Sequence, residues 1–174
     1  MIFKPLTLDW IKRRMIFLGV GTNLGNKAKN ILQAYQHLEK SGVKILRKSA
    51  LYHSEAWGIR DQDSFFNTVI EVEFNGRPKD LLDICLEVEK KMGRERIYKW
   101  GPRLIDIDII CFHDVFVRSR NLSLPHPYYT ERAFVLAPLA ELEPNWIDKT
   151  SGKGIKDLLM EIPAEDACVK IAEE

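Results

Sequence analysis

The chain has 174 residues, of which 45% are apolar and 29% charged, and its formal net charge at pH 7 is +1. These values are typical of one globular domain that buries its own core. The near-neutral charge argues against nonspecific attraction to nucleic acids or membrane surfaces. No apolar run approaches the length of about 18 residues that a membrane span needs. We therefore expect neither a nucleic-acid nor a membrane partner.

The chain has three cysteines, Cys85, Cys111 and Cys168, which are widely spaced. An odd number without a C-x-x-C pair argues against a disulfide framework and a zinc ribbon. The N-terminus also lacks the order of charged and apolar regions found in a signal peptide. We expect free thiols in a reducing compartment, and hence a cytoplasmic protein.

Residues 1–14 are predicted to be an extension and residues 15–174 a single domain. Two interpretations of the extension stay open: Met15 is the original start, or the segment is an arm that docks through Leu8 and Trp10.

In the first half of the domain, strands are predicted at 15–20, 43–53 and 65–74 from their apolar runs. Residues 21–26 have turn chemistry and precede a helix whose apolar face runs from Ala28 to Leu38 and which Ser41-Gly42 ends. Residues 54–64 are polar and are predicted to form a loop.

In the second half, Pro78 is suited to open a helix over 78–92, and a basic loop follows at 93–103. A strand is predicted at 104–112, with 115–117 pairing with it as a short hairpin. Residues 118–130 are predicted to be irregular, and helices are expected at 131–141 and 155–161.

The resulting order β-α-β-β-α-β over residues 15–112 predicts an α+β protein with a ferredoxin-like split core. This fold has an antiparallel four-stranded sheet with two helices on one face. We expect its other face and the adjoining loops to be open for ligands, with a hairpin and helices added at the C-terminal end.

The strand at 104–112 carries two carboxylates, Asp106 and Asp108, which alternation places on one face, opposite Ile105, Ile107 and Ile109. Two like charges side by side are unfavourable unless a cation lies between them. Mg²⁺ takes oxygen ligands and commonly binds one or two carboxylates plus substrate phosphates. The alternative is a half-buried strand whose acids are merely solvated.

Basic residues gather in the loop before this strand, at Arg94, Arg96, Lys99 and Arg103. Arginine binds phosphate oxygens with a bidentate fork. The alternative is a solvated connection. The glycines from Gly19 to Gly25 are spaced too widely for a nucleotide fingerprint and are interpreted as a tight turn, so side chains and metal must hold any phosphates.

A third group of residues suits a flat heterocycle. Asn67 can read the edge of such a ring, and aromatic faces are available at Trp57, Phe65, Trp100 and Phe134. His126 lies in a stiff Pro-His-Pro segment and can contact phosphate or act as an acid or base. Each of these residues, taken singly, has a structural explanation as core or turn.

Five segments in order resemble the 6-hydroxymethyl-7,8-dihydropterin pyrophosphokinase family. The most specific is W-G-P-R-L-I-D-I-D-I-I at 100–110, and the others lie at 21–25, 52–67, 89–96 and 124–139. The resemblance covers about residues 15 to 147. It implies an enzyme of folate biosynthesis that transfers pyrophosphate from ATP to the hydroxymethyl group of the pterin and releases AMP.

The resemblance also implies roles for individual residues. Asp106 and Asp108 would hold two Mg²⁺ ions, and Arg94 and Arg103 would act in catalysis by contacting the phosphates. The expected ATP-binding residues are Glu89, Arg94, Arg96, Arg103, Ile109, His126 and Arg132. The expected pterin-binding residues are Ser54, Trp57, Phe65, Asn67, Trp100 and Phe134. We expect a monomer, and association with another folate enzyme stays open.

The sequence departs from the family at several places. Leu86 stands where a glutamine is frequent, Pro127 follows His126 where some members have tyrosine, and the loop at 96–100 is short. Two other functions stay open: a ferredoxin-like RNA-binding module, disfavoured because the RNP1 pattern is missing and the chain is near neutral, and a metal-dependent phosphohydrolase that uses the same aspartates.

Overall fold

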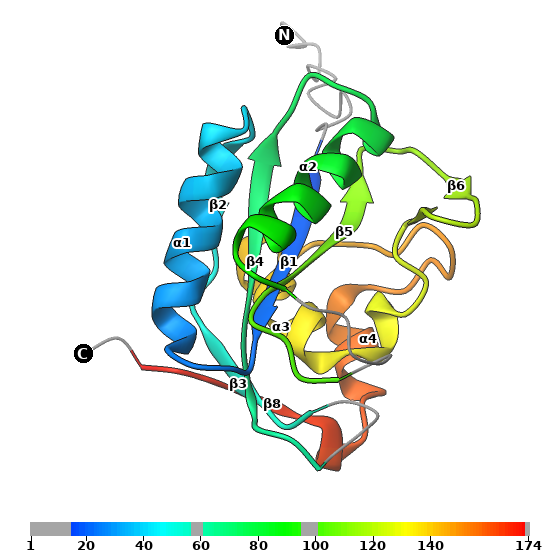
Figure 1. Ribbon diagram of the computed structural model, residues 1–174. Helices are drawn as coiled ribbons and strands as arrows, with labels where there is room; N and C mark the ends of the chain where they lie inside the picture. Colours follow the sequence, from blue (N-terminus) through cyan, green and yellow to red (C-terminus); the bar gives the residue numbers. More distant parts are fainter. Residues whose placement is uncertain (1–14, 57–60, 95–100, 173–174) are drawn as a thin grey trace, which may run out of the picture.

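A computed structural model of the chain describes residues 15–56, 61–94 and 101–172 (Figure 1). An antiparallel sheet lies between two helical layers. The main strands are β1 (Ile16–Thr22), β2 (Lys44–Lys48), β3 (Tyr52–Ser54), β4 (Phe65–Glu73) and β5 (Asp106–Phe112). The strands follow the order β5-β1-β4-β3-β8, where β8 is the short strand Cys168–Lys170, and β2 also pairs with β4. This order confirms the ferredoxin-like α+β core.

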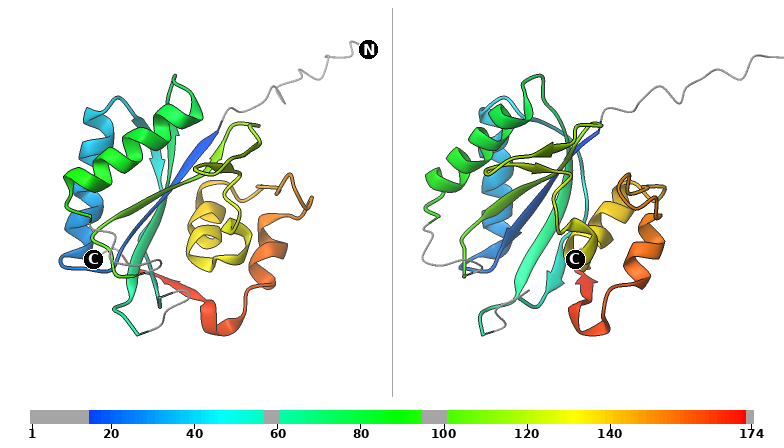
Figure 2. Two further views of the ribbon diagram at one scale, coloured as in Figure 1. Left: turned by 45° about the vertical axis from the view of Figure 1, so that its right-hand side comes forward. Right: turned by 90° about the vertical axis from the view of Figure 1, so that its right-hand side faces the viewer.

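Helices α1 (Lys27–Lys40) and α2 (Pro78–Lys91) cover one face of the sheet (Figure 2). Asn26 caps α1 by accepting from Lys29 N, and Gly42, with φ of 87°, follows its end. At the start of α2, where Pro78 occupies the first turn, the Asp80 carboxylate accepts from Arg77 N at 2.9 Å and also from the Arg77 guanidinium. Both helices therefore begin and end where the sequence predicts.

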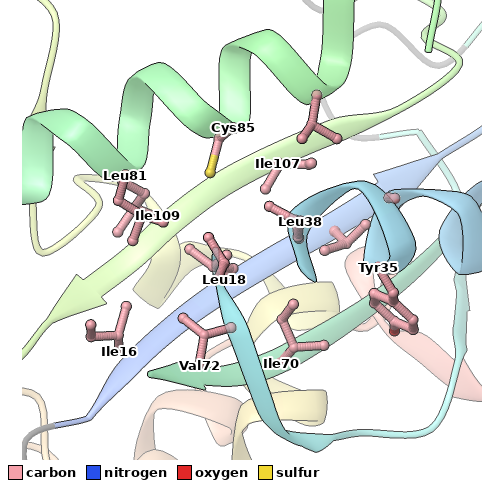
Figure 3. Close-up of a cluster of buried hydrophobic side chains, with 14 of the residues drawn as sticks. Ile16, Leu18, Tyr35, Leu38, Ile70, Val72, Leu81, Cys85, Ile107 and Ile109 are labelled. Carbon is pink, nitrogen blue, oxygen red and sulfur yellow. The ribbon is translucent and has the colours of Figure 1, made fainter. Parts of the chain in front are cut away.

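The core between these helices and the sheet follows from strand alternation (Figure 3). Ile16 and Leu18 of β1, with Ile70 and Val72 of β4, point toward Leu38, Leu81 and Cys85 on the helices. Ile107 and Ile109 of β5 join the same cluster. The isoleucines that alternate with the two acids on β5 are thus buried, as predicted. Asp106 and Asp108 face the opposite side of the sheet.

The opposite face of the sheet is not as open as expected. Helices α3 (Ala133–Leu142) and α4 (Ile155–Met160) pack over part of it (Figure 2). A second core forms there, in which Phe17, Val69 and Ile110 of the sheet contact Leu136 and Leu139 of α3. The open ligand surface is therefore reduced to the end of the sheet where Asp106, Gly21 and Asn67 lie. Helix α3 starts at the edge of this end and leaves it uncovered.

The predicted strand at 43–53 is wrong in one respect, since it is divided into β2 and β3. Between Lys48 and Tyr52 the chain advances four residues while β4 advances three, from Ile70 to Asn67. Within this bulge, Ala50 N donates to Glu141 on α3 at 3.0 Å. A side chain from a distant helix thus replaces the ladder partner of Ala50.

Several shorter elements also differ from the predictions. The strand at 104–112 begins at Asp106, and β1 extends through Thr22, so Gly21 is a strand residue rather than part of a turn. The segment at 115–117 does not pair with β5; instead β6 (Val117–Arg118) pairs with β7 (Ser123–Leu124). The helix predicted at 131–141 is a 3-10 turn η1 (Tyr129–Glu131) followed by α3. The C-terminal part adds η2 (Ala164–Asp166) and β8 (Cys168–Lys170).

Within the described residues, no helix has the length and apolar character that crossing a membrane requires. The three cysteines are unpaired; Cys85 and Cys111 are buried.

Candidate active site

The candidate site is a pocket above the glycines of β1. The pocket has an empty volume of about 750 Å³, its open mouth included. In register, Gly21 lies between Asp106 on β5 and Asn67 on β4, and Gly19 lies between Asp108 and Val69. Because the central strand has no side chains at these two positions, a hollow forms between the acids and Asn67.

The two acids are held by different cations. Asp106 accepts from Arg94 at 2.7 Å and also contacts Arg103. Asp108 lies 3.6 Å from Arg132 and 3.9 Å from Nε2 of His126. The structure therefore brings together the acid pair, the two arginines predicted to act in catalysis, and His126 and Arg132, two further predicted ATP-binding residues.

Glu89 on α2 supports this arrangement from behind. It is 3% exposed and accepts from Ile107 N at 2.8 Å, and it also contacts Arg94. Burial raises the pKa of Glu89, while the neighbouring Arg94 opposes the shift. Glu89 thus ties α2 to β5 and to the guanidinium that faces Asp106.

The electrostatics of the acid pair suit a cation. Loss of hydration in the site, together with the adjacent Asp106 carboxylate, raises the pKa of Asp108 to about 7, against the opposing effect of Arg132. Two carboxylates whose mutual repulsion shifts a pKa in this way favour binding of positive charge between them.

His126 is neutral at pH 7. Burial, reinforced by Arg132, lowers the pKa of His126 to about 4. Its Nδ1 accepts from Tyr128 N at 3.2 Å, so the proton lies on Nε2, the atom nearest Asp108. His126 therefore presents a neutral N–H donor toward the acid pair.

A second hollow, a groove with an empty volume of about 2500 Å³ that includes the open space at its mouth, runs between α2 and residues 117–122 on the other side of the acids. Glu89 and Arg94 line the groove, as do Leu82 and Leu86 of α2. Five residues line both the pocket and the groove, and they are Arg103, Asp106, Asp108, His126 and Arg132. The charged cluster is thus a wall shared by two binding spaces.

The pocket has aromatic and polar surfaces away from this wall. Phe65 at the start of β4 and Phe134 at the start of α3 both line it. Asn67 is 6% exposed and donates to Ser54 Oγ at 2.9 Å. The predicted ring-binding residues Ser54, Phe65, Asn67 and Phe134 are therefore gathered in one pocket.

Not every predicted residue contributes a side chain to these spaces. The side chain of Ile109 is 4% exposed and lies in the core beneath α2, so it lines neither the pocket nor the groove. Ile110, one residue further, lines the pocket instead, because strand alternation places it on the same face as Asp106 and Asp108. Trp57, Arg96 and Trp100 lie outside the described residues.

Asn23 was missed by the sequence analysis as a site residue. It is fully buried; its amide donates to Gln62 Oε1 at 3.1 Å and to the Asp63 carbonyl at 3.0 Å, and its Oδ1 accepts from Arg103 N at 2.8 Å. Asn23 thus joins the segment before β4 to the segment before β5. The sequence signals were its place in a turn that precedes a helix and its membership of the 21–25 segment of the family resemblance, and neither reveals these distant partners.

The structure disfavours one alternative function. A ferredoxin-like RNA-binding module stacks bases on its exposed sheet face, but here α3 packs on that face around Phe17 and Val69.

The chain was compared with known proteins. Residues 17–144 match the family model of 7,8-dihydro-6-hydroxymethylpterin-pyrophosphokinase (HPPK). Two relatives are named 2-amino-4-hydroxy-6-hydroxymethyldihydropteridine pyrophosphokinase. The one from Methylorubrum extorquens is 38% identical over 84% of this chain and 92% of its own, and the one from Aquifex aeolicus is 38% identical over 88% and 95%.

Solved structures agree in fold. A structure titled HPPK-DHPS in complex with substrates has a TM-score of 0.66 at 16% identity, and wild-type HPPK-DHPS of Plasmodium falciparum with SDX-DHP has 0.64 at 19%. The two matches include 86% and 84% of this chain, but only 43% of each of the longer HPPK-DHPS chains.

Fold and relatives together define an α+β enzyme that transfers pyrophosphate. The chain belongs to the 7,8-dihydro-6-hydroxymethylpterin-pyrophosphokinase family. Its activity is pyrophosphate transfer to 6-hydroxymethyl-7,8-dihydropterin in folate biosynthesis, and ATP is the co-substrate of the family.

Proposed function

We propose that the pocket holds the pterin, that the groove holds ATP, and that pyrophosphate is transferred at the wall between them. The observation that supports this most directly is that Asp106, Asp108 and Arg103 line both spaces. A transfer reaction needs its donor and acceptor in contact across a small gap, held in line. A charged wall open to both sides meets that need.

The pterin ring is proposed to lie between Phe65 and Phe134, because flat heterocycles stack on aromatic faces. Asn67 would pair with the edge of the ring, and its bond to Ser54 fixes the orientation of its amide. Trp57 and Trp100 are proposed to complete the pterin site.

The ATP phosphates are proposed to bind Arg94, Arg103, Arg132 and His126. In the structure the first three guanidinium groups face the two acids. Phosphate oxygens offer an arginine fork the same kind of bidentate partner as a carboxylate. Glu89 holds Arg94 in place, and Arg96 and the backbone of Ile109 are proposed to complete the ATP site.

The residues present fit Mg²⁺. Asp106 and Asp108 offer carboxylate oxygens on one face of β5, which are the ligands that Mg²⁺ prefers. Among the described residues, no group of three or more His, Cys, Asp or Glu side chains converges on one point, so ATP oxygens and water would complete the coordination. When bound, two Mg²⁺ ions would neutralise the polyphosphate and orient its β-phosphorus.

We also propose that the protein is a cytoplasmic monomer. Three unpaired cysteines suit a reducing compartment. Association with another folate enzyme stays a proposal as well; it is supported by similarity to the longer HPPK-DHPS chains.

The assignment of the two spaces can be tested with matched phenylalanine variants. Phe134→Ala should weaken pterin binding by roughly tenfold or more through loss of a stacking face and leave ATP binding within about twofold. Phe116→Ala, at a side chain that is 56% exposed and remote from the pocket lining, is the control. Calorimetric titration of each ligand with Mg²⁺ present would measure both affinities.

The assignment would be contradicted if Phe134→Ala weakened ATP binding and left pterin binding unchanged. Release of inorganic phosphate from ATP without pterin would instead favour the phosphohydrolase alternative.

A further inference from the structure

A buried hydrogen-bonded group lies directly behind the shared wall. Tyr129, Trp146 and Asp148 are 3%, 8% and 2% exposed. The Tyr129 hydroxyl donates to Asp148 Oδ1 at 2.6 Å and accepts from Trp146 Nε1 at 3.3 Å. None of the roles proposed above uses these three residues.

Asp148 is fixed by its own turn. Its Oδ2 accepts from Ser151 N at 2.7 Å and from Ser151 Oγ at 2.6 Å. Its backbone closes the turn, because Asp148 N donates to the Lys153 carbonyl at 2.9 Å and Gly152 N donates to the Asp148 carbonyl at 2.7 Å. The carboxylate that receives the Tyr129 hydroxyl is therefore a rigid anchor.

Trp146 connects the same group to the sheet and to α4. Its ring packs edge-on against Phe17 of β1, with centroids 5.8 Å apart. Its carbonyl accepts from Ile155 N, at the start of α4, at 2.9 Å. The Tyr129 hydroxyl is thus held by a unit that does not itself line the pocket or the groove.

Tyr129 occupies the middle of the segment that carries two wall residues. His126 lies three residues before it and Arg132 three residues after it, and both face Asp108. In residues 126–132, Tyr129 is the one buried residue. The backbone bonds within this turn are long, at 3.3 Å from Tyr129 N to the His126 carbonyl and 3.4 Å from Arg132 N to the Tyr129 carbonyl.

We propose that Tyr129, held by Asp148 and Trp146, is a positioning residue that sets the placement of His126 and Arg132 against Asp108. Tyr129 lines the pocket, and its ring belongs to the core cluster that contains Phe17 and Leu136. Packing therefore holds the ring, and the two hydroxyl bonds add a directional anchor that fixes its position. The proposal rests on the proposed assignment of His126 and Arg132 to the ATP site.

The test replaces Tyr129 by phenylalanine, which keeps the ring and removes the hydroxyl. Tyr52→Phe is the matched control, because the Tyr52 hydroxyl donates to Glu141 Oε2 at 2.8 Å and Tyr52 lines neither the pocket nor the groove. A purely structural role predicts similar losses of thermal stability and no change in ligand affinity for both variants.

We expect Tyr129→Phe to weaken binding of the ATP analogue α,β-methylene-ATP with Mg²⁺ by roughly tenfold, since small misplacements of charged contacts have large effects. Tyr52→Phe should stay within about twofold of the wild type. Ser151→Ala, which removes one part-buried bond to Asp148, should shift the affinity in the same direction by less. Equal analogue affinity in wild type, Tyr129→Phe and Ser151→Ala would overturn the proposal.

The same titrations separate this proposal from the site assignment. Arg132→Ala should weaken binding of the ATP analogue more than Tyr129→Phe does. If Arg132→Ala binds the analogue like the wild type, the assignment of the ATP site is wrong. If Arg132→Ala binds the analogue more weakly than the wild type and Tyr129→Phe binds it equally well, only the positioning role of Tyr129 fails.

Discussion

Gly21 lies directly opposite Asn67 in the antiparallel pairing of β1 and β4, and a Cβ atom on residue 21 would come within 2.8 Å of Asn67 Oδ1. A contact that short requires something to move. The glycine therefore leaves room for the Asn67 amide at the floor of the pocket. From the sequence alone, Gly21 was predicted to serve a tight turn.

Gly21→Ala is expected to raise the KM for the pterin roughly tenfold, because overpacking costs about 1–3 kcal/mol and displaces the Asn67 amide. Gly19→Ala is the comparison, since its Cβ would meet only Ile110 Cδ1 at an ordinary 3.6 Å. Steady-state kinetics with varied pterin would measure both. A larger effect at Gly19 than at Gly21 would contradict the role of the Gly21–Asn67 contact.

Asn23→Ala is expected to lower the free energy of unfolding by about 2–4 kcal/mol, because two side-chain donor bonds and one acceptor bond are lost in a fully buried site. It should also lower kcat, since Arg103 N loses its anchor. Urea unfolding and AMP formation would test this. Asn145→Ala, at an exposed asparagine, provides the control; equal stability of the two variants would refute the joining role of Asn23.

The lowered pKa of Asp148 should make the free energy of unfolding depend on pH. Burial acts to raise its pKa, but hydrogen bonds from Ser151 and Tyr129 outweigh burial and hold the pKa below its usual value. A lowered pKa in the folded state means that ionised Asp148 stabilises the fold above about pH 4, and that this stabilisation is lost as pH falls through the folded-state pKa.

Asp148→Asn should therefore lower the free energy of unfolding at pH 7 by about 1–3 kcal/mol and lose less stability than the wild type between pH 5 and pH 3, a range set by the ordinary pKa of aspartate at about 4. Urea unfolding at several pH values would measure the slope. An unchanged slope in Asp148→Asn would show that Asp148 is not the group responsible.

Much of the fold follows from local pattern. Alternation in β5 predicted that Asp106 and Asp108 share one face and that Ile107 and Ile109 lie on the other, where they enter the core. Pro78 and Ser41-Gly42 marked helix limits because their backbone preferences act locally. These features depend on neighbours within a few residues, so the sequence displays them directly.

The features that were missed depend on distant partners. The strand at 43–53 divides because Glu141, 91 residues after Ala50, replaces a ladder bond. Strand β8 has only three residues and exists through its pairing with β3. Helix α3 covers the sheet face because Leu136 and Leu139 pack there in one core cluster with Phe17 and Val69. No local pattern shows which of two faces such a helix will cover.

The candidate site divides in the same way. Residue types and spacing identified the acids, arginines and aromatic residues, and the structure brings the described ones together. The shared wall, the Asn23 junction and the Tyr129–Asp148 pair could not be predicted, because each is a contact between segments far apart in the chain.

The central claim is that the carboxylates between pocket and groove, Asp106 and Asp108, bind Mg²⁺ with ATP for transfer to the pterin. The most direct measurement is AMP formation from ATP, Mg²⁺ and 6-hydroxymethyl-7,8-dihydropterin by the wild type and by Asp108→Asn, with circular dichroism to confirm folding. The account predicts that folded Asp108→Asn forms AMP at least about a hundredfold more slowly than the wild type. A folded Asp108→Asn variant with the wild-type rate and the wild-type Mg²⁺ dependence would contradict it.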